Sequence, residues 1–252
     1  MRALRTAPAS CCIYCLATGV PRTEEHLIPH CLGGRLTLRD AVCEPCRRLT
    51  GRREQFTLDH DFAVPRTLLA LKRRRARGKG PTRFPTVAMA GGEGPAPGLN
   101  AATFPRAFSL PAFEPAGLLA GAIRTQQAPR IDAIACRLDL GTPTQHNVAA
   151  ATPPRDARAY AWAIAKWAYA LAVAERGLGG CDAQAMRDLL LGRRDDVFDF
   201  VGTPAARKPA SRERLHDHAV QDDGPWLTVT LALFASAGML PYEVVIGRVT
   251  SP

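Results

Sequence analysis

The residues that decide the fold are two cysteine pairs and the segment between them: CIYC at 12–15, EHLIPHCLGG at 25–34 and CEPC at 43–46. Each CxxC turn can place two thiolates about 2.3 Å from one metal ion, and two such turns complete a tetrahedral site. The spacing therefore predicts a structural zinc site formed by Cys12, Cys15, Cys43 and Cys46. Scattered core cysteines would have no reason to repeat in this spacing, and disulfides are disfavoured because nothing here indicates secretion.

Between the cysteine pairs, a carboxylate and an imidazole are adjacent in Glu25 and His26. On a short apolar strand their side chains point to opposite faces, unless a bend or bulge at Pro29 brings them toward one cleft. Gly33 and Gly34 then supply a turn whose backbone can approach a ligand closely. The alternative is that His26 only packs on a half-buried strand.

Together these motifs resemble the HNH endonucleases, the ββα-metal nucleases, and in particular zinc-stapled members with the pattern CxxC, EHxIPxxLGG and CxxCN. The resemblance covers residues 12–71, and the later stretches AIAKWAYALAVAERG, LLLGRRDDVFDFVG and LFASAGMLPYEVVIG resemble the C-terminal half of larger members. It implies that His26 is the general base that deprotonates water, and that Glu25 is a ligand of a catalytic divalent cation. The members it resembles are bacterial nucleases.

Two positions depart from the family pattern. The middle asparagine, which ties the loop between the strands, aligns by spacing with Asp40, and an ionised aspartate accepts hydrogen bonds but does not donate them. The last metal ligand is replaced by Arg47, which stays charged and does not bind cations. The site therefore holds its cation with Glu25, water and substrate phosphate, or borrows His30, Asp59, His60 or Asp61, or has lost cleavage while Arg47 contacts a phosphate.

The chain is basic. Its 252 residues include 33 Lys and Arg against 23 Asp and Glu, which gives a formal net charge of +10. Such a balance favours a polyanionic partner, since phosphate neutralisation dominates non-specific nucleic-acid affinity. We interpret the densest basic run as a nucleic-acid-binding segment, the alternative being a solvated face or charged linker. The run consists of Lys72, Arg73, Arg74, Arg75, Arg77 and Lys79.

The sequence predicts a cytoplasmic protein with reduced thiols and no membrane partner. The N-terminal stretch MRALRTAPASCCIYC has no apolar run long enough for a signal peptide. No uninterrupted apolar stretch approaches about 20 residues, since the alanine-rich segment 157–174 contains Arg158 and Lys166. Cys136 and Cys181 lack a partner motif and are expected to be buried small hydrophobes.

We expect an α+β fold in two parts. A zinc-stapled ββα-metal module occupies residues 9–79, and a mixed domain with a long helix packed on antiparallel strands occupies residues 80–252. In the first part, helical pieces follow Cys43 and are interrupted near Pro65. Hydrophobic content of 46% with 22% charged residues is typical of a folded protein.

The second part contains three predictable features. The long helix is expected at 155–176, because prolines precede it and Gly177 follows it. A shorter helix is expected at 182–191, and a hairpin at 226–235 and 242–249.

Two functions are weighed against each other. The first is a metal-dependent HNH-type endonuclease, a hydrolase of phosphodiester bonds in nucleic acid with DNA as the expected substrate, structural Zn²⁺ and catalytic Mg²⁺ or Mn²⁺. The second is a catalytically degenerate, zinc-stabilised nucleic-acid-binding protein, which Asp40 and Arg47 favour. A third hypothesis, that the zinc module mediates protein contacts, has no motif of its own.

Overall fold

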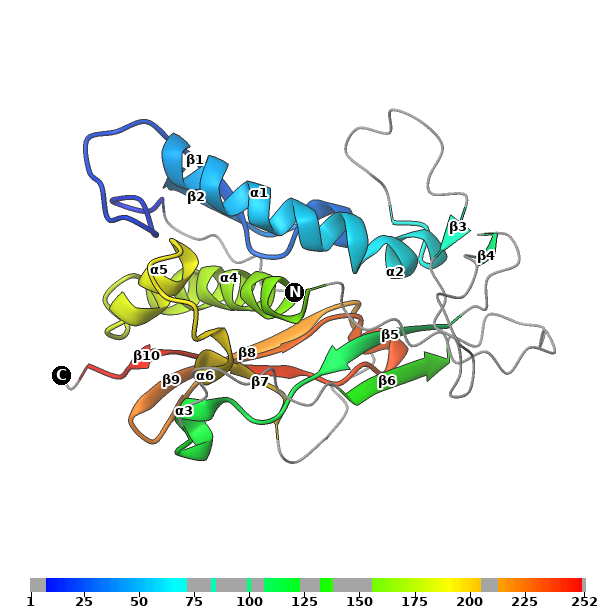
Figure 1. The fold of residues 1–252 in the computed structure, drawn as a ribbon. Coiled ribbons are helices and arrows are strands. Elements are labelled where there is room, and N and C mark those ends of the chain that lie inside the picture. Colours follow the sequence, from blue (N-terminus) through cyan, green and yellow to red (C-terminus); the bar gives the residue numbers. More distant parts are fainter. Residues whose placement is uncertain are drawn as a thin grey trace.

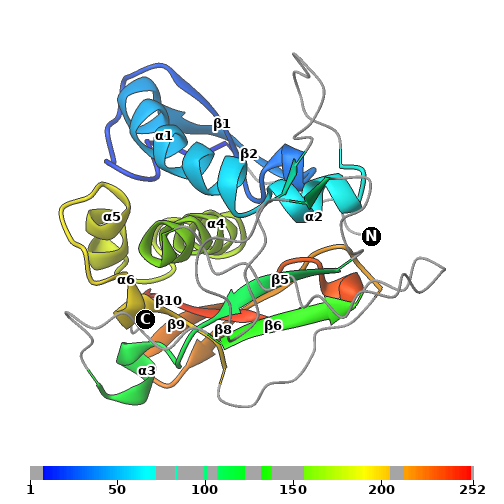
Figure 2. The ribbon, with the colours of Figure 1, turned by 45° about the vertical axis from the view of Figure 1, so that its right-hand side comes forward.

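The computed structural model describes residues 8–71, 83–84, 99–100, 107–122, 132–137, 156–204 and 213–250. These residues form three layers: an N-terminal hairpin with its helix, a central long helix, and an antiparallel sheet (Figures 1 and 2). The α+β class expected from the sequence is confirmed. No helix within these ranges combines the length and the hydropathy that crossing a membrane requires.

The N-terminal layer is a strand–strand–helix unit. β1 (Arg22–His26) pairs antiparallel with β2 (Thr37–Cys43), and β2 leads directly into α1 (Glu44–His60). The register shifts between Thr23 and Glu25, after which Glu25 pairs with Leu38 and His26 with Thr37. The irregularity in the hairpin therefore lies at Glu24 and not at Pro29.

The helical pieces after the hairpin break earlier than expected. α1 ends at His60, and α2 (Ala63–Leu68) begins after Phe62. Pro65 lies within α2, in its first turn, where the missing backbone N–H has no intrahelical acceptor to lose. The proline therefore starts the second helix instead of interrupting the first.

The turn at Gly33 and Gly34 closes the connection between the two strands. A short 3₁₀ helix, η1 (His30–Leu32), ends at Gly33, whose φ of 90° lies in the left-handed region that glycine adopts without strain. A Cβ at Gly34 would lie 2.0 Å from the carbonyl oxygen of Ile28. The glycine pair thus permits a close approach between two parts of the same backbone, at Gly34 and Ile28, and not an approach to a ligand.

α4 (Ala157–Arg176) is the central layer and confirms the predicted long helix. Its N-cap is Asp156, which accepts hydrogen bonds from the backbone N–H groups of Arg158 and Ala159 at 2.9 and 3.0 Å. Every residue from Tyr160 to Val173 is buried. Apart from Lys166 this stretch is largely apolar on every side, as expected for a helix covered by the N-terminal unit on one side and the sheet on the other. Its alanines let both layers approach closely.

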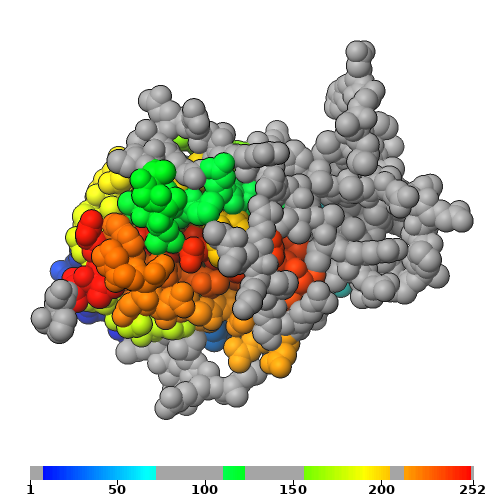
Figure 3. Space-filling model, turned by 90° about the horizontal axis from the view of Figure 1, so that it is seen from below, coloured from blue at the N-terminus to red at the C-terminus, as the bar shows by residue number. Residues whose placement is uncertain are grey.

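The third layer is a four-stranded antiparallel sheet in the order β7-β10-β9-β8. Its strands are β7 (Val201–Gly202), β8 (Asp217–Asp223), β9 (Trp226–Ala232) and β10 (Tyr242–Arg248). The predicted terminal hairpin is confirmed, since β9 and β10 pair from Trp226 opposite Arg248 to Leu231 opposite Tyr242. Seen from below, β8 and β9 (orange) form part of the surface (Figure 3).

Short elements complete the described chain. β3 (Arg83–Phe84) pairs with β4 (Leu99–Asn100), and β5 (Ala107–Ala112) pairs with β6 (Asp132–Arg137). The helices are α3 (Gly117–Ala120), α5 (Gln184–Leu190), α6 (Val197–Phe200) and the 3₁₀ turn η2 (Ala235–Ala237). α5 is shorter than the predicted helix at 182–191. It begins two residues later because the Asp182 carboxylate accepts the backbone N–H of Gln184.

The layers share one hydrophobic core. A continuous cluster of buried side chains includes residues of the cysteine-containing N-terminal segment, α1, α4 and the sheet. Phe62 stacks on Tyr160 with ring centroids 5.3 Å apart, and the Tyr160 hydroxyl is 3.0 Å from that of Tyr242. The N-terminal unit is thus joined to the sheet through α4, while the predicted boundary at residue 79 lies outside the described residues.

His216 joins the sheet region to the N-terminal layer. Its Nδ1 accepts the backbone N–H of Phe234 at 3.2 Å, so its Nε2 carries the proton and donates to the carbonyl of Leu32 at 2.7 Å. Burial lowers the pKa of His216, although the Leu32 carbonyl opposes the shift. The folded protein therefore holds this imidazole neutral.

We expect this histidine to make stability depend on pH. Since its pKa is lower in the folded than in the unfolded chain, stability is full above about pH 6.5 and falls as the pH drops further, because the unfolded chain takes up the proton first. Urea unfolding of wild type and His216→Gln at pH 7.5 and 5.5 measures this. The loss on acidification should be smaller in His216→Gln, and His60→Gln should behave like wild type. Equal losses in all three proteins would contradict the assignment.

Candidate metal centre

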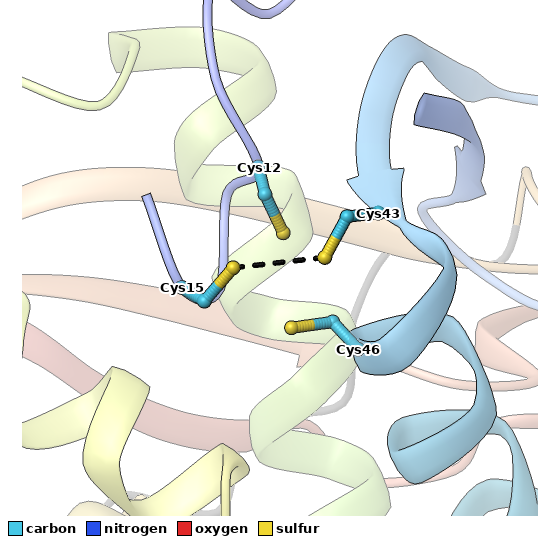
Figure 4. Close-up of side chains that lie close together, drawn as sticks. All are labelled: Cys12, Cys15, Cys43 and Cys46. Atoms are coloured by element: carbon cyan, nitrogen blue, oxygen red, sulfur yellow. Dashed lines mark hydrogen bonds between the residues drawn. The ribbon is translucent and has the colours of Figure 1, made fainter. Parts of the chain in front are cut away.

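Four cysteines converge at the N-terminal end of the hairpin and helix. The sulfur atoms of Cys12, Cys15, Cys43 and Cys46 all lie within 4.8 Å of one another (Figure 4). The Sγ atoms of Cys15 and Cys43 are 3.6 Å apart, close to the edge of about 3.8 Å that a tetrahedron with 2.3 Å Zn–S bonds requires. The donor set and its spacing therefore fit a structural metal such as zinc.

Local backbone geometry presents each pair of sulfurs. Cys12 and Cys15 stand on a tight turn in which the N–H of Leu16 donates to the carbonyl of Cys12 at 2.8 Å. Cys43 is both the last residue of β2 and the N-cap of α1, and Cys46 lies in the first turn of the helix. A metal bound here would fasten the turn to the strand and the helix together. Cys11 and Cys31 do not belong to the group.

The electrostatics of the cluster favour a cation. Burial, and then the neighbouring Cys12 sulfur, raise the pKa of Cys46 above its ordinary value. A buried thiolate among other sulfurs needs a compensating positive charge, and Zn²⁺ supplies it. The four cysteines would then act as thiolates that hold the ion in a closed, structural site.

Glu25 points into the protein. Its carboxylate is buried, and its Oε1 lies 2.5 Å from Nζ of Lys166 on α4. The same ammonium donates to Oε1 of Glu54 on α1 at 2.8 Å, and the indole N–H of Trp167 donates to that oxygen at 2.6 Å. We call Glu25, Glu54 and Lys166 the buried charge cluster, and it joins β1, α1 and α4.

The buried charge cluster is electrostatically constrained. Desolvation raises the pKa of Glu25, and Lys166 opposes this shift. Desolvation also disfavours the charged form of Lys166, but Glu54 and Glu25 overcome it and raise its pKa. Lys166 therefore remains an ammonium ion and gives Glu25 the positive partner that a divalent cation would otherwise provide.

His26 lies on the opposite face of β1 from Glu25. It is half-buried and pairs across the hairpin with Thr37, whereas Glu25 pairs with the buried Leu38. Of the two arrangements open from the sequence, the structure has the one in which adjacent strand residues diverge. The rings of His26 and His30 lie with their centroids 6.4 Å apart and their planes nearly perpendicular.

The two positions that depart from the family pattern are exposed. Asp40 has a φ of 48°, and its backbone carbonyl accepts Nε–H of Arg22 at 2.7 Å. Arg47 donates to both carboxylate oxygens of Glu44 at 2.7 and 2.9 Å. Arg48 shares the same carboxylate at 2.7 Å. Hydrogen bonds from the two guanidinium groups lower the pKa of Glu44 to about 2.

The structure does not gather the alternative ligands into a second site. Asp59 accepts a hydrogen bond from Gln55 at 2.7 Å, and His60 contacts the Phe56 carbonyl at 2.7 Å. His30 is exposed and Asp61 is partly buried. Among the described residues, the four cysteines are the one group of three or more His, Cys, Asp or Glu side chains placed to share an ion. The four alternative ligands therefore do not form a second group of this kind within the described ranges, and the catalytic divalent cation stays a prediction.

Lys166 is the important residue that the motifs do not predict. Its signal in the sequence is a single lysine inside an alanine-rich apolar helix, since a buried ammonium requires a carboxylate partner. The basic residues Lys72, Arg73, Arg74, Arg75 and Arg77 lie outside the described ranges. Within them, the exposed arginines of α1 are the nearest equivalent: Arg47, Arg48, Arg52 and Arg53.

Comparison with known proteins adds no relative. No family model, curated protein or solved structure matches the chain. The function must therefore be argued from the residues and their geometry.

Proposed function

We propose that this protein binds nucleic acid through a zinc-stapled strand–strand–helix module of the HNH type. The observation that carries the proposal is the arginine surface of α1, formed by Arg47, Arg48 and Arg52, directly after the metal ligand Cys46. The single carboxylate of Glu44 accepts hydrogen bonds from two of these arginines, Arg47 and Arg48. The surface thus keeps a net positive charge that suits a phosphate backbone.

Binding is favoured over hydrolysis by the state of Glu25. In the HNH resemblance this carboxylate holds a divalent cation beside the scissile phosphate. Here its Oε1 contacts Lys166 at 2.5 Å and the side chain is buried. A cation at this position would have to displace an ammonium that two carboxylates stabilise, and Arg47 offers no replacement ligand.

Hydrolysis is the second candidate, and His26 is the observation that favours it. The imidazole stands at the end of β1, half-exposed and on the face away from the buried charge cluster. A histidine there can accept a proton from water without involving Glu25. In this reading DNA is the expected substrate.

Duplex binding tests the proposal directly. The purified zinc-loaded protein should bind plasmid DNA with an affinity that falls steeply with salt. Arg48→Gln/Arg52→Gln should reduce the slope of log K against log salt by roughly 2, because each lost phosphate contact removes about 0.9. Arg214→Gln, at an exposed arginine outside the module, is the matched control and should keep the slope. Duplex RNA run in parallel identifies the preferred nucleic acid.

The same preparation separates binding from cleavage. With Mg²⁺, Mn²⁺ or EDTA the plasmid should remain supercoiled, and His26→Ala should bind as wild type does. Nicking that needs a divalent ion and disappears in His26→Ala would replace the binding proposal with the hydrolytic one. A protein that neither binds nor cuts would exclude both and leave protein contacts as the role of the zinc module.

A further inference from the structure

A cavity of about 440 Å³ lies between α1, α4 and the connection from α5 to α6, away from the cysteine cluster. α1 contributes Arg53 and Phe56, and α4 contributes Arg158 and Trp162. Arg194, between α5 and α6, also lines the cavity. Three guanidinium groups and two aromatic rings therefore line one cavity, although more than a hundred positions separate the residues of α1 from those of α4.

Arg53 differs from the other arginines of this cavity because no carboxylate among the described residues forms an ion pair with it. Its guanidinium carbon lies 5.6 Å from the centre of the Trp162 ring, which holds it by a cation–π contact. Gly192 admits it, since a Cβ there would lie 2.4 Å from one guanidinium nitrogen. The N–H donors of Arg53 are therefore held in place and available.

The other two arginines of the cavity, Arg158 and Arg194, already have hydrogen-bond partners. Arg158 donates to the carbonyl of Asp195 at 3.1 Å, and its contact with that carboxylate is longer, at 3.5 Å. Arg194 binds the carboxylate of Asp196 through two nitrogens. The Asp195 side chain is 88% exposed, so water screens its charge. Arg158 thus retains donors that can turn toward an anion held by Arg53.

The aromatic side of the cavity is equally ordered. Phe56 is 36% exposed, and His60 packs on it with ring centroids 4.5 Å apart. The Trp162 indole is fixed by a 3.3 Å hydrogen bond from Nε1 to the carbonyl of Leu189. An exposed ring supported from behind, beside an oriented guanidinium, offers a stacking surface next to an anion site.

We propose that this cavity binds a nucleotide, with the base stacked on Phe56 and the phosphate bound by Arg53 and Arg158. Asp156 also lines the cavity and is held as the N-cap of α4. Its negative charge disfavours a polyanion that fills the cavity. Its carboxylate can accept a hydrogen bond from the amino group of a base. The ligand is either a free mononucleotide or the terminal unit of a single strand. The proposal does not depend on duplex binding by the arginine surface of α1.

Calorimetric titration of the full zinc-loaded protein tests it, with guanosine and adenosine monophosphates, the two nucleosides, inorganic phosphate and a 5′-phosphorylated oligothymidylate as probes. A monophosphate should bind more tightly than its nucleoside or phosphate. Phe56→Ala should weaken binding roughly 5- to 150-fold, the range of one base–aromatic stack. Arg53→Gln should weaken it roughly 10- to 150-fold through a lost charge-assisted hydrogen bond.

Arg52→Gln is the matched control, because this neighbouring arginine is exposed and does not line the cavity. It should leave nucleotide binding unchanged while it weakens duplex binding. Saturable binding of the oligonucleotide without the free nucleotides, lost in both cavity variants, supports the proposal and identifies a strand end as the ligand. Absence of binding by every probe, or phosphate binding that Phe56→Ala leaves unchanged, would overturn it. Circular dichroism of each variant confirms that it is folded.

Discussion

Replacing Cys43 with serine is expected to abolish zinc binding and unfold the N-terminal layer. Cys43 ends β2 and caps α1, so a metal bound by the four cysteines would join the strand to the helix. Structural zinc contributes apparent binding energies of about 10–16 kcal/mol in small domains. That is as large as the whole free energy of unfolding of a typical domain, roughly 5–15 kcal/mol. The hairpin should therefore unfold when zinc is absent.

The loss should spread to the central helix. The Tyr169 hydroxyl on α4 donates to the carbonyl of Ile13, inside the first CxxC turn, at 2.5 Å. The rings of Tyr14 and Tyr169 also pack, with centroids 5.9 Å apart. When the turn is released, these buried contacts are lost with it. We therefore expect Cys43→Ser to lower the melting temperature of the whole protein.

Zinc content by atomic emission and thermal unfolding by circular dichroism measure the effect. Wild type should carry one zinc ion per chain, and a strong chelator should reproduce the Cys43→Ser melt. Cys11→Ser is the control, since Cys11 lies beside the cluster without belonging to it. Retention of one zinc ion by Cys43→Ser, with an unchanged melt, would remove the cysteine cluster as the metal site.

The features that the sequence predicts correctly are those set by local geometry. A CxxC turn fixes the separation of its two sulfurs whatever the rest of the chain does, so four cysteines were enough to place the cluster. α4 was equally predictable, because Pro153 and Pro154 precede it, Gly177 follows it and its alanines favour helix. The β9–β10 hairpin followed from alternation within each strand.

The environment of Glu25 could not be predicted from the sequence, because it depends on a contact between residues that are distant in the chain. The sequence left two arrangements of Glu25 and His26 on β1, and in the observed one Glu25 contacts Lys166, which lies 141 positions away. The family pattern treats Glu25 as a metal ligand, but it contains no information about what α4 places against that strand. In the structure the ammonium ion of Lys166 lies against Glu25, where the family pattern expects a metal ion.

Lys166→Met is expected to destabilise the protein by about 3–5 kcal/mol, the cost of leaving a buried charge without its partner. Lys166 is 3% exposed and Glu25 is 8% exposed at their side chains, so water cannot replace the lost ammonium. Adding Glu25→Leu should recover much of the loss, because apolar side chains of similar size can replace a buried ion pair. Arg176→Met, at the exposed end of the same helix, should stay within about 0.5 kcal/mol of wild type.

Acidification gives an independent readout of the same variant. Burial already raises the pKa of Glu25, and without Lys166 that pKa should rise further. A carboxyl whose pKa is higher in the folded than in the unfolded chain gains stability as the pH falls through the folded value toward about 4.3. The gap between Lys166→Met and wild type in urea unfolding should therefore narrow from pH 7.5 to 5.5. A gap that is constant with pH, or smaller than about 1 kcal/mol throughout, would mean that Glu25 does not depend on Lys166, and Glu25 would again be available as a ligand for a divalent cation.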